Sequence, residues 1–332
     1  MMLSAHELAR VFFAGESDEA RIVAADTFDE CEHLGAASIA IGVFDGVHLG
    51  HQELIAALVR DARAHDCKAV VVTFDPDPDV VVSPSPAQKL MTTVDRLGAL
   101  AQTGVDAVVA VPFTPEVAAL DHVGFLALLS RVLDIRSIRV GSDFRLGRGG
   151  ASGVAEMRAW GAKRGVDVYG HDLLCEGGEA ICATRIRHEL GQGHVELAAE
   201  LLGRPYMVRG GVIRGRHEGA GMGFPTANLQ VPDGIQVPAD GVYEGLVLVD
   251  DTVWPAAVNV GLPPTYAASA HLEANLIGYT GDLYGASVSL AFTRWLRPSR
   301  VFDSLDELIA TVEGNIEDIR HNLGEQGVSI RD

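Results

Sequence analysis

Apolar and polar positions along the first half of the chain follow the pattern of alternating strands and helices. Residues 68–74 form a continuous apolar run of the kind found in parallel strands buried on both faces. A helix is predicted from about Gly50, where Leu54, Ile55, Leu58 and Val59 recur on one face. Further strands are predicted at 38–44, 105–111 and 137–140, and further helices at 93–102, 123–133 and 155–164. This alternation predicts a doubly wound parallel sheet up to about residue 190.

The pattern changes near residue 204, where short strand-like runs separated by Gly, Pro and Asp begin. They cover 207–213, 241–249, 256–260, 271–277 and 286–295. Such runs are typical of a small antiparallel β-barrel. Apolar residues then recur at helical spacing over 304–323, and Ser304 with Glu307 is a candidate capping box. The second half therefore predicts a barrel followed by a C-terminal helix.

These patterns divide the chain into three parts. Residues 1–190 are predicted to form the α/β domain, residues 191–203 a connecting helix or linker, and residues 204–332 the barrel domain. Before residue 38 the sequence is less informative, although a strand is expected near 20–24.

Composition excludes several classes of function. The 332 residues carry a formal net charge of −19, which disfavours nonspecific contact with nucleic acid or anionic membranes. The cysteines, Cys31, Cys67, Cys175 and Cys182, form no C-x-x-C pair, so neither a zinc knuckle nor a disulfide framework is indicated. We find neither a signal-peptide pattern nor an apolar run long enough to span a membrane. We expect a cytoplasmic protein whose partners are small molecules; the sequence does not indicate an oligomeric state.

The string 42–52, GVFDGVHLGHQ, is the strongest chemical signal in the first half. A strand ends, glycines let the chain turn, and two histidines open a helix whose free N–H groups suit phosphates. His48 and His51 can both donate hydrogen bonds to a polyphosphate. A generic pair of this spacing is more often an ordinary surface feature, but Gly46 and Gly50 around it favour a site.

This string resembles the H-x-G-H signature of nucleotidylyltransferases, and more narrowly the N-terminal module of bacterial bifunctional riboflavin kinase/FMN adenylyltransferases, or FAD synthetases. Segments 90–96, 111–113, 140–147 and 184–187 resemble later family motifs in order and spacing. The resemblance implies that His48 and His51 are catalytic. It implies ATP contacts for Gly42, Phe44, Gly46, Gly50, Thr184, Arg185 and Arg187. It also places Asp143 and Phe144 by the flavin, although core packing is an equal alternative for Phe144.

Two positions depart from the family pattern. Asp77 stands where the family has a histidine, and Ala183 stands where it has a serine. A carboxylate beside the triphosphate is expected to weaken nucleotide binding by repulsion. The alternative interpretation is therefore a riboflavin kinase alone, with a degenerate or altered-specificity N-terminal domain.

A second signal is the stretch 215–228, GRHEGAGMGFPTAN. Its glycines, with Gly215, Gly221 and Gly223 as candidate phosphate contacts, give a backbone able to wrap phosphates. Thr226 and Asn228 are two residues apart, so in an extended stretch their oxygens point to one side and can share Mg²⁺. A glycine-rich loop by itself is more often a flexible turn.

G-F-P-T-A-N resembles the riboflavin kinase signature, with family-like segments at 238–243, 257–266, 273–276 and 281–285. The resemblance implies that Glu273 is the catalytic base, that Thr226 binds phosphate as well as Mg²⁺, and that Arg297 contacts flavin. The implied enzyme is a kinase and nucleotidyltransferase that phosphorylates riboflavin with ATP to FMN and then adenylylates FMN to FAD, releasing pyrophosphate. A flavin- or nucleotide-binding regulator with neither activity is a further alternative, but binding alone would not need Glu273.

Overall fold

The computed structural model describes residues 4–13, 20–24, 32–214, 224–261 and 271–331. The chain divides into two compact units. The first, here called the α/β unit, comprises Glu16–Ala87 and Thr92–Ala183. The second, the barrel unit, comprises Met1–Gly15, Gln88–Met91 and Thr184–Asp332.

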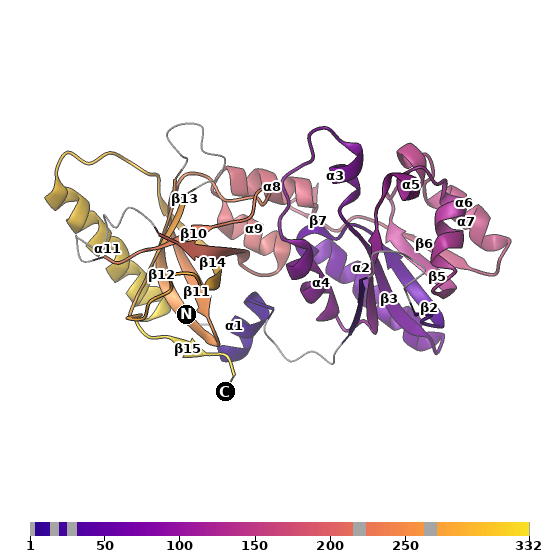
Figure 1. Cartoon of the computed structure of the whole chain (residues 1–332), viewed down its shortest axis with the longest axis horizontal. Coiled ribbons are helices and arrows are strands. Elements are labelled where there is room, and N and C mark those ends of the chain that lie inside the picture. The colour runs from indigo at the N-terminus through magenta and orange to yellow at the C-terminus, as the bar shows by residue number, and fades with distance from the viewer. Residues whose placement is uncertain (1–3, 14–19, 25–31, 215–223, 262–270, 332) are drawn as a thin grey trace. The chain divides into compact units, whose positions relative to one another are not determined.

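The α/β unit is built on a six-stranded sheet in the order β1-β4-β3-β2-β5-β6. All its pairings are parallel. The strands are β1 (Arg21–Ala24), β2 (Ala36–Ile41), β3 (Lys68–Asp75), β4 (Ala107–Pro112), β5 (Asp134–Gly141) and β6 (Asp167–His171). Strand order reverses between β2 and β5, so the predicted doubly wound parallel sheet is confirmed (Figure 1).

The helices of this unit cover both faces of the sheet. They are α2 (Leu49–Ala64), α3 (Pro78–Val82), α4 (Thr93–Ala101), α5 (Pro115–Ala118), α6 (His122–Leu129) and α7 (Val154–Ala162), with 3-10 turns η2 (Asp45–Val47) and η3 (Arg148–Gly150). Val70 and Val72 of β3 pack in one core with Phe125 of α6 and Met157 of α7. Val71 points to the opposite face and is also fully buried, on the side where α2 packs. Burial on both faces explains why this strand has no polar alternation. A short hairpin, β7 (Cys175–Glu176) and β8 (Glu179–Ala180), ends the unit.

The barrel unit contains a closed ring of six strands. Neighbours follow the order β11-β14-β9-β10-β13-β12, and β12 pairs back with β11. The members are β9 (Tyr206–Ile213), β10 (Ala227–Gln230), β11 (Gly241–Val249), β12 (Thr252–Gly261), β13 (His271–Leu276) and β14 (Ser287–Arg297), with β15 (Val328–Ser329) added beside β12. Val212, Leu229, Leu272 and Val260 are aligned across four adjacent strands and are all buried. The predicted antiparallel barrel is confirmed.

The C-terminal helix α11 (Leu305–Leu323) packs on the outside of this barrel. Ser304 caps it by accepting a hydrogen bond from the Glu307 N–H at 3.2 Å. Ile316 and Ile319 of the helix share an apolar cluster with Ile277 at the end of β13. Helices α8 (Ala183–Gly191) and α9 (Val195–Leu202) also belong to the barrel unit, apart from the first residue of α8.

The N-terminal helix α1 (Ala5–Val11) belongs to the barrel unit although it is furthest from the barrel in sequence (Figure 1). Leu8, Val11 and Phe12 are buried in one apolar cluster with Met207, Leu246, Val253 and Ala291 of the barrel strands. The guanidinium of Arg204 lies 4.7 Å from the ring centroid of Phe13 and supports the same end of the helix. Burial lowers the pKa of Arg204 to about 10. Residues at the chain's start therefore complete a core formed by its second half.

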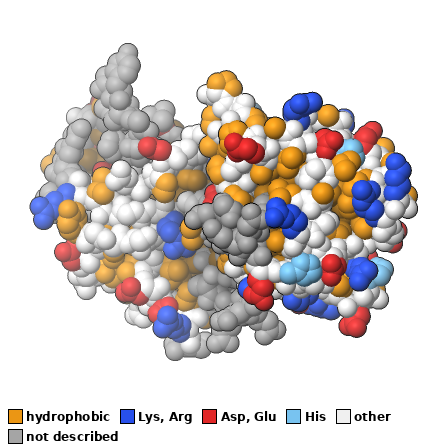
Figure 2. All heavy atoms as spheres, turned by 45° about the vertical axis from the view of Figure 1, so that its right-hand side comes forward, with side chains coloured by type: hydrophobic (Ala, Val, Ile, Leu, Met, Phe, Trp, Pro, Cys, Tyr) orange, Lys and Arg blue, Asp and Glu red, His pale blue; other side chains and the backbone are white. Residues whose placement is uncertain are grey.

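Charged side chains of both signs lie at the surface. On the face shown in Figure 2, basic and acidic side chains of the described residues are interspersed. Across the described part of the chain, no helix is both long and apolar enough to cross a membrane.

Candidate active sites

The loop after β2 is held in an unusual backbone conformation. Phe44 (φ 57°), Gly46 (φ 77°) and Val47 (φ 42°) all adopt positive φ within four residues. Positive φ is costly for residues with a Cβ, and such strain persists only where the surroundings impose it. Here the Thr73 hydroxyl donates to the Val43 carbonyl at 3.0 Å and fixes the loop to β3. The motif 42–52 thus forms a rigid turn at the carboxyl end of a central strand.

Two glycines make room for aromatic rings in this turn. A Cβ at Gly42 would lie 3.1 Å from the ring of Phe44, and one at Gly50 would lie 3.3 Å from the ring of His48. Both distances are tighter than normal packing, so a larger residue would push these rings away. Phe44 is 2% exposed and contacts His51 edge-on, with ring centroids 5.1 Å apart. The Phe44 ring therefore packs against the ring of His51.

His48 and His51 form a stacked pair at the start of α2. Their ring centroids are 3.6 Å apart and their planes differ by 21°. His48 is the N-cap of α2 but makes no side-chain cap hydrogen bond. Burial, then the neighbouring His48 and then Arg96 hold the pKa of His51 well below its usual value. His51 is therefore neutral near pH 7, and a neutral imidazole still offers one N–H to an anion.

A buried polar network anchors the C-terminal part of α2, the helix that begins at these histidines, on the sheet. The Asp61 carboxylate, on α2, accepts hydrogen bonds from Ser38 of β2 at 3.0 Å, from Arg139 of β5 at 2.9 Å, and from Ser137 of β5. Burial alone would raise the pKa of Asp61, but these hydrogen bonds and the charge of Arg139 bring it below its usual value. The network spans β2 and β5, so it fixes α2 across the point where strand order reverses.

Asp77 does not present a bare carboxylate. Its side chain is 5% exposed and forms an ion pair with Arg96, which is 1% exposed. A second N–H of Arg96 donates to the Phe74 carbonyl at 2.7 Å. The expectation of simple repulsion toward nucleotide is therefore wrong in its premise, because a guanidinium already compensates the charge.

The segment expected near the flavin follows β5, the neighbour of β2. Its Gly141 carbonyl accepts the Phe144 N–H at 3.0 Å, which forms a tight turn. Phe144 is partly buried against the core of the α/β unit, while Asp143 is exposed. Ligands of doubly wound sheets bind at the carboxyl ends of strands where the order reverses. The loop after β2 and the loop after β5 therefore lie at neighbouring carboxyl ends, at the point where strand order reverses.

Thr184, Arg185 and Arg187 lie together on α8. The Arg187 guanidinium donates to the Thr184 hydroxyl at 3.2 Å, and Thr184 is exposed. Ala183 is the first residue of this helix. These three residues are grouped with the barrel unit, whereas the histidine pair belongs to the α/β unit.

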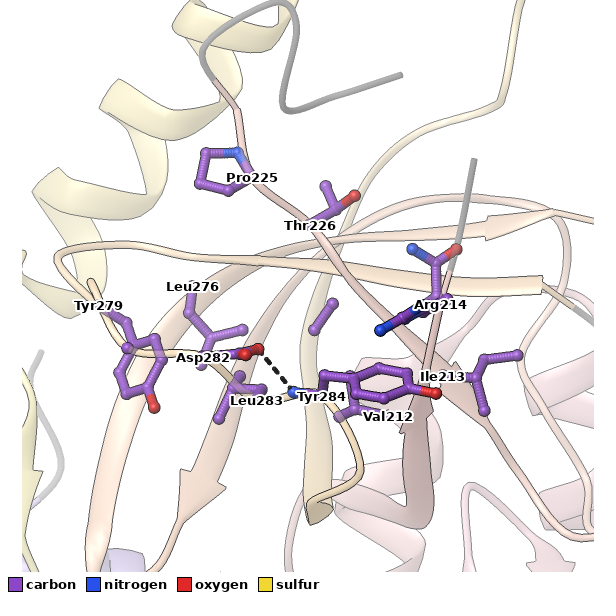
Figure 3. Close-up of a pocket in the computed structure, with 13 residues that line it drawn as sticks. Val212, Ile213, Arg214, Pro225, Thr226, Leu276, Tyr279, Asp282, Leu283 and Tyr284 are labelled. Atoms are coloured by element: carbon purple, nitrogen blue, oxygen red, sulfur yellow. Dashed lines mark hydrogen bonds between the residues drawn. The ribbon is translucent and has the colours of Figure 1, made fainter. Parts of the chain in front are cut away.

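The barrel unit contains a pocket of about 480 Å³ beside Thr226 and Asn228 (Figure 3). Its described lining comes from the end of β9, the start of β10 and the segment after β13: Val212, Ile213, Arg214, Pro225, Thr226, Ala227, Asn228, Leu276, Tyr279, Gly281, Asp282, Leu283 and Tyr284. Arg214 lies over the Tyr284 ring, 4.7 Å from its centroid. The Tyr284 N–H donates to the Asp282 carboxylate at 2.9 Å and holds this turn in place. The pocket thus combines hydroxyl, amide, carboxylate and guanidinium groups with an aromatic surface.

Glu273 lies beside this pocket in a polar row on the barrel's outer face. Asn228 pairs directly with Glu273 on β13, and Glu273 pairs with Asn259 on β12. Directly opposite residues share a face of the sheet, with Cβ atoms about 5 Å apart. The adjacent row, Leu229 with Leu272, faces the barrel interior. Glu273 is absent from the described pocket lining, but it adjoins Asn228, which is part of that lining.

The oxygen donors fit a magnesium ion. Thr226 and Asn228 offer a hydroxyl and an amide oxygen at the pocket, and Mg²⁺ prefers few protein oxygens together with phosphate and water. No group of three or more His, Cys, Asp or Glu suited to a metal occurs among the described residues.

The remaining predicted site residues have different outcomes. Arg297, at the end of β14, donates from Nε to the Asn315 amide oxygen of α11 at 3.0 Å. Burial, then the charge of Arg300, lowers its pKa. Gly215, Gly221 and Gly223 lie outside the described residues. Asp282 and Tyr284 of the pocket lie within the family-like segment 281–285, but the sequence did not single them out as site residues. Arg214 directly precedes the glycine-rich stretch and was not assigned a role from the sequence.

The fold and the two sites define a two-domain, nucleotide-dependent transferase. A family model described as FAD synthetase matches residues 31–185, and one described as riboflavin kinase matches residues 202–323. The chain belongs to the bifunctional riboflavin kinase/FMN adenylyltransferase family. The Escherichia coli K12 protein of that name is 34% identical over 278 residues, covering 82% of this chain and 88% of that protein. The Bacillus subtilis protein is 31% identical over 289 residues, covering 85% and 91%.

A solved structure has the same fold over nearly the whole chain. It is described as a macrolide-efflux protein from Streptococcus pneumoniae, with a TM-score of 0.82 and 27% sequence identity. The match covers 90% of this chain and 98% of that one. The family models and the named relatives, and not this likeness of fold, identify both domains as those of an enzyme that phosphorylates riboflavin to FMN and adenylylates FMN to FAD.

Proposed function

We propose that the two reactions are divided between the two units, with riboflavin phosphorylation at the barrel pocket and adenylyl transfer at the histidine pair. The observation that carries this assignment is the presence of two separate built sites, one in each unit. One has oxygen donors beside a carboxylate, and the other has stacked histidines at a helix start. ATP serves as phosphoryl donor in the first reaction and adenylyl donor in the second.

In the barrel unit, we assign Glu273 as the base that accepts the proton of the ribityl 5′-hydroxyl as that oxygen attacks the γ-phosphate of ATP. Its position beside Asn228 supports this role. Thr226 and Asn228 would hold Mg²⁺, which supplies charge neutralisation at the phosphates, and Thr226 would also contact phosphate. Gly215, Gly221 and Gly223 are proposed to contact the phosphates, and Arg297 to contact the flavin.

In the α/β unit, the FMN phosphate attacks the α-phosphorus of ATP and pyrophosphate leaves in line. His48 and His51 would donate hydrogen bonds to the oxygens that gain charge. Gly42, Phe44, Gly46 and Gly50 are proposed to contact ATP, and Gly42 and Gly50 also leave room for the rings of Phe44 and His48. Thr184, Arg185 and Arg187 are proposed to hold the β- and γ-phosphates, and Asp143 and Phe144 to contact the flavin. Because both reactions consume ATP, we propose a cytoplasmic location.

The test is to follow the two products separately. Full-length protein with riboflavin, ATP and Mg²⁺ is expected to give FMN and then FAD. With supplied FMN it is expected to release pyrophosphate and FAD in equal amounts. If the protein forms FMN from riboflavin but forms no FAD from riboflavin or from supplied FMN, this proposal is wrong. The protein would then be a riboflavin kinase whose α/β unit does not catalyse adenylyl transfer.

A further inference from the structure

Asp77 occupies a helix N-cap position without capping the helix. Asp is among the residues that most often cap a helix through their side chain. Here it is the N-cap of α3, yet its side chain makes no cap hydrogen bond and is instead paired with Arg96. The carboxylate is thus committed to a partner on another helix, at the strand end that faces the motif loops.

Arg96 lies where a positive charge is unfavourable. It is on the first turn of α4, where the helix dipole opposes a cation, and it is fully buried. Its N–H groups reach Asp77 and the Phe74 carbonyl, so it ties α4 to the end of β3. Removing one partner of a buried ion pair leaves an uncompensated charge, which is strongly unfavourable. In this chain, Asp77 therefore compensates the charge of the buried Arg96.

The charge of Arg96 acts on the histidine pair. Helix α4 packs against η2, the turn that leads to His48. After burial and His48, Arg96 is the next cause of the low pKa of His51. The acidic residues of these two elements are Asp45 of η2 and Asp95 of α4. The Asp95 carboxylate accepts a hydrogen bond from the Thr92 hydroxyl at 2.6 Å.

We propose that Asp77 is a positioning residue for adenylyl transfer, holding Arg96 against the end of β3 and compensating its charge beside the histidine pair. This rests on the proposed assignment of adenylyl transfer to that pair. The sequence alone suggested that the Asp77 carboxylate weakens nucleotide binding, whereas this proposal makes the same carboxylate favourable for adenylyl transfer. Asp77→His is expected to lower FAD formation, because it removes the counter-charge of a buried guanidinium.

The test is a set of charge variants read by NMR titration of the His51 ring in the full-length protein. Arg96→Gln leaves Asp77 uncompensated, so the His51 titration is expected to move to higher pH. Arg96→Lys keeps the charge and is expected to stay near wild type. Asp77→Asn is expected to move the His51 titration to lower pH. The double variant Asp77→Asn with Arg96→Gln is expected to return the titration toward that of the wild type. If Arg96 acted only by filling space, Arg96→Gln and Arg96→Lys would show the same His51 titration.

Activity provides the second readout. Asp77→Asn is expected to lower kcat/KM for FAD formation by about tenfold or more, since small displacements of catalytic groups are costly. FMN formation in the same chain should be unchanged. Equal titrations for Arg96→Gln and Arg96→Lys, or full FAD activity in Asp77→Asn, would overturn the proposal. If Asp77→Asn does not fold, the double variant and the two Arg96 variants decide it. If the wild-type protein forms no FAD, the assignment of adenylyl transfer to the histidine pair is refuted. The NMR titrations still test the role of Asp77, because they do not depend on FAD formation.

Discussion

The burial of α1 in the barrel unit predicts that a residue near the start of the chain controls the stability of the kinase. Phe12 is 2% exposed and packs in one cluster with Met207 and Leu246. Phe12→Ala leaves a cavity, and such truncations cost about 3–5 kcal/mol. For a unit of this size, that corresponds to a fall in Tm of roughly 6–20 °C. Since domains are stable by only about 5–15 kcal/mol, the loss is a large share of the total.

The assay uses the two activities to report on the two units. Samples are heated, cooled and tested for FMN formation from riboflavin and for FAD formation from supplied FMN. Phe12→Ala is expected to lower the inactivation temperature of FMN formation more than that of FAD formation. Phe125→Ala is a matched control, because Phe125 is also 2% exposed but lies in the core of the α/β unit. It is expected to affect FAD formation instead.

A third variant isolates the packing contribution. Arg10 is exposed on α1, so Arg10→Ala is expected to change neither inactivation temperature by more than a few degrees. Phe12→Ala with unchanged kinase inactivation, or with FAD formation as the more sensitive activity, would refute the reasoning. Either result would mean that α1 does not contribute to the barrel core in solution.

Four further outcomes are expected. Glu273→Gln should lower kinase turnover by about 10²-fold or more while FAD formation from FMN persists, as measured by separate product assays. Thr226→Val should raise the Mg²⁺ concentration needed for half-maximal FMN formation, whereas Thr226→Ser should not. Replacing His48 and His51 together by Ala should lower FAD formation by at least about 10²-fold with FMN formation intact. Because the folded-state pKa of His51 lies below its usual 6.5, the unfolded chain binds more protons below that pH. The α/β unit should therefore lose stability in urea titrations as the pH falls below about 6.5, and His51→Gln should reduce that loss.

Much of the α/β unit was predictable because its elements carry their own patterns. The apolar run 68–74 became β3, and the apolar face from Leu54 to Leu58 became buried on α2. The strand expected near 20–24 is β1. The first two segments are long or strongly patterned, so local sequence was enough, whereas β1 has only four residues. The histidine pair was also predictable, because the glycines around it are required by the turn.

Other features depend on distant partners and could not be read locally. Helix α1 has seven residues, too few for a stable helix on its own, and its apolar partners come from the barrel strands. Strand β10 has four residues and follows a proline, so its alternation is too short to recognise. The Asp77–Arg96 pair joins two helices, and nothing in the spacing of the two residues indicates that they meet. Sequence alone therefore suggested an unpaired carboxylate.

The packing of α1 also has a consequence for synthesis on the ribosome. Phe12 emerges about 200 residues before Met207, its nearest cluster partner in sequence among the barrel strands. At translation rates of about 5–20 residues per second, this is a wait of roughly 10–40 s. During that time the α/β unit can complete its own sheet, while Leu8, Val11 and Phe12 lack the apolar contacts they have in the finished protein. The nascent chain therefore exposes these three apolar residues until the barrel strands that cover them have been made.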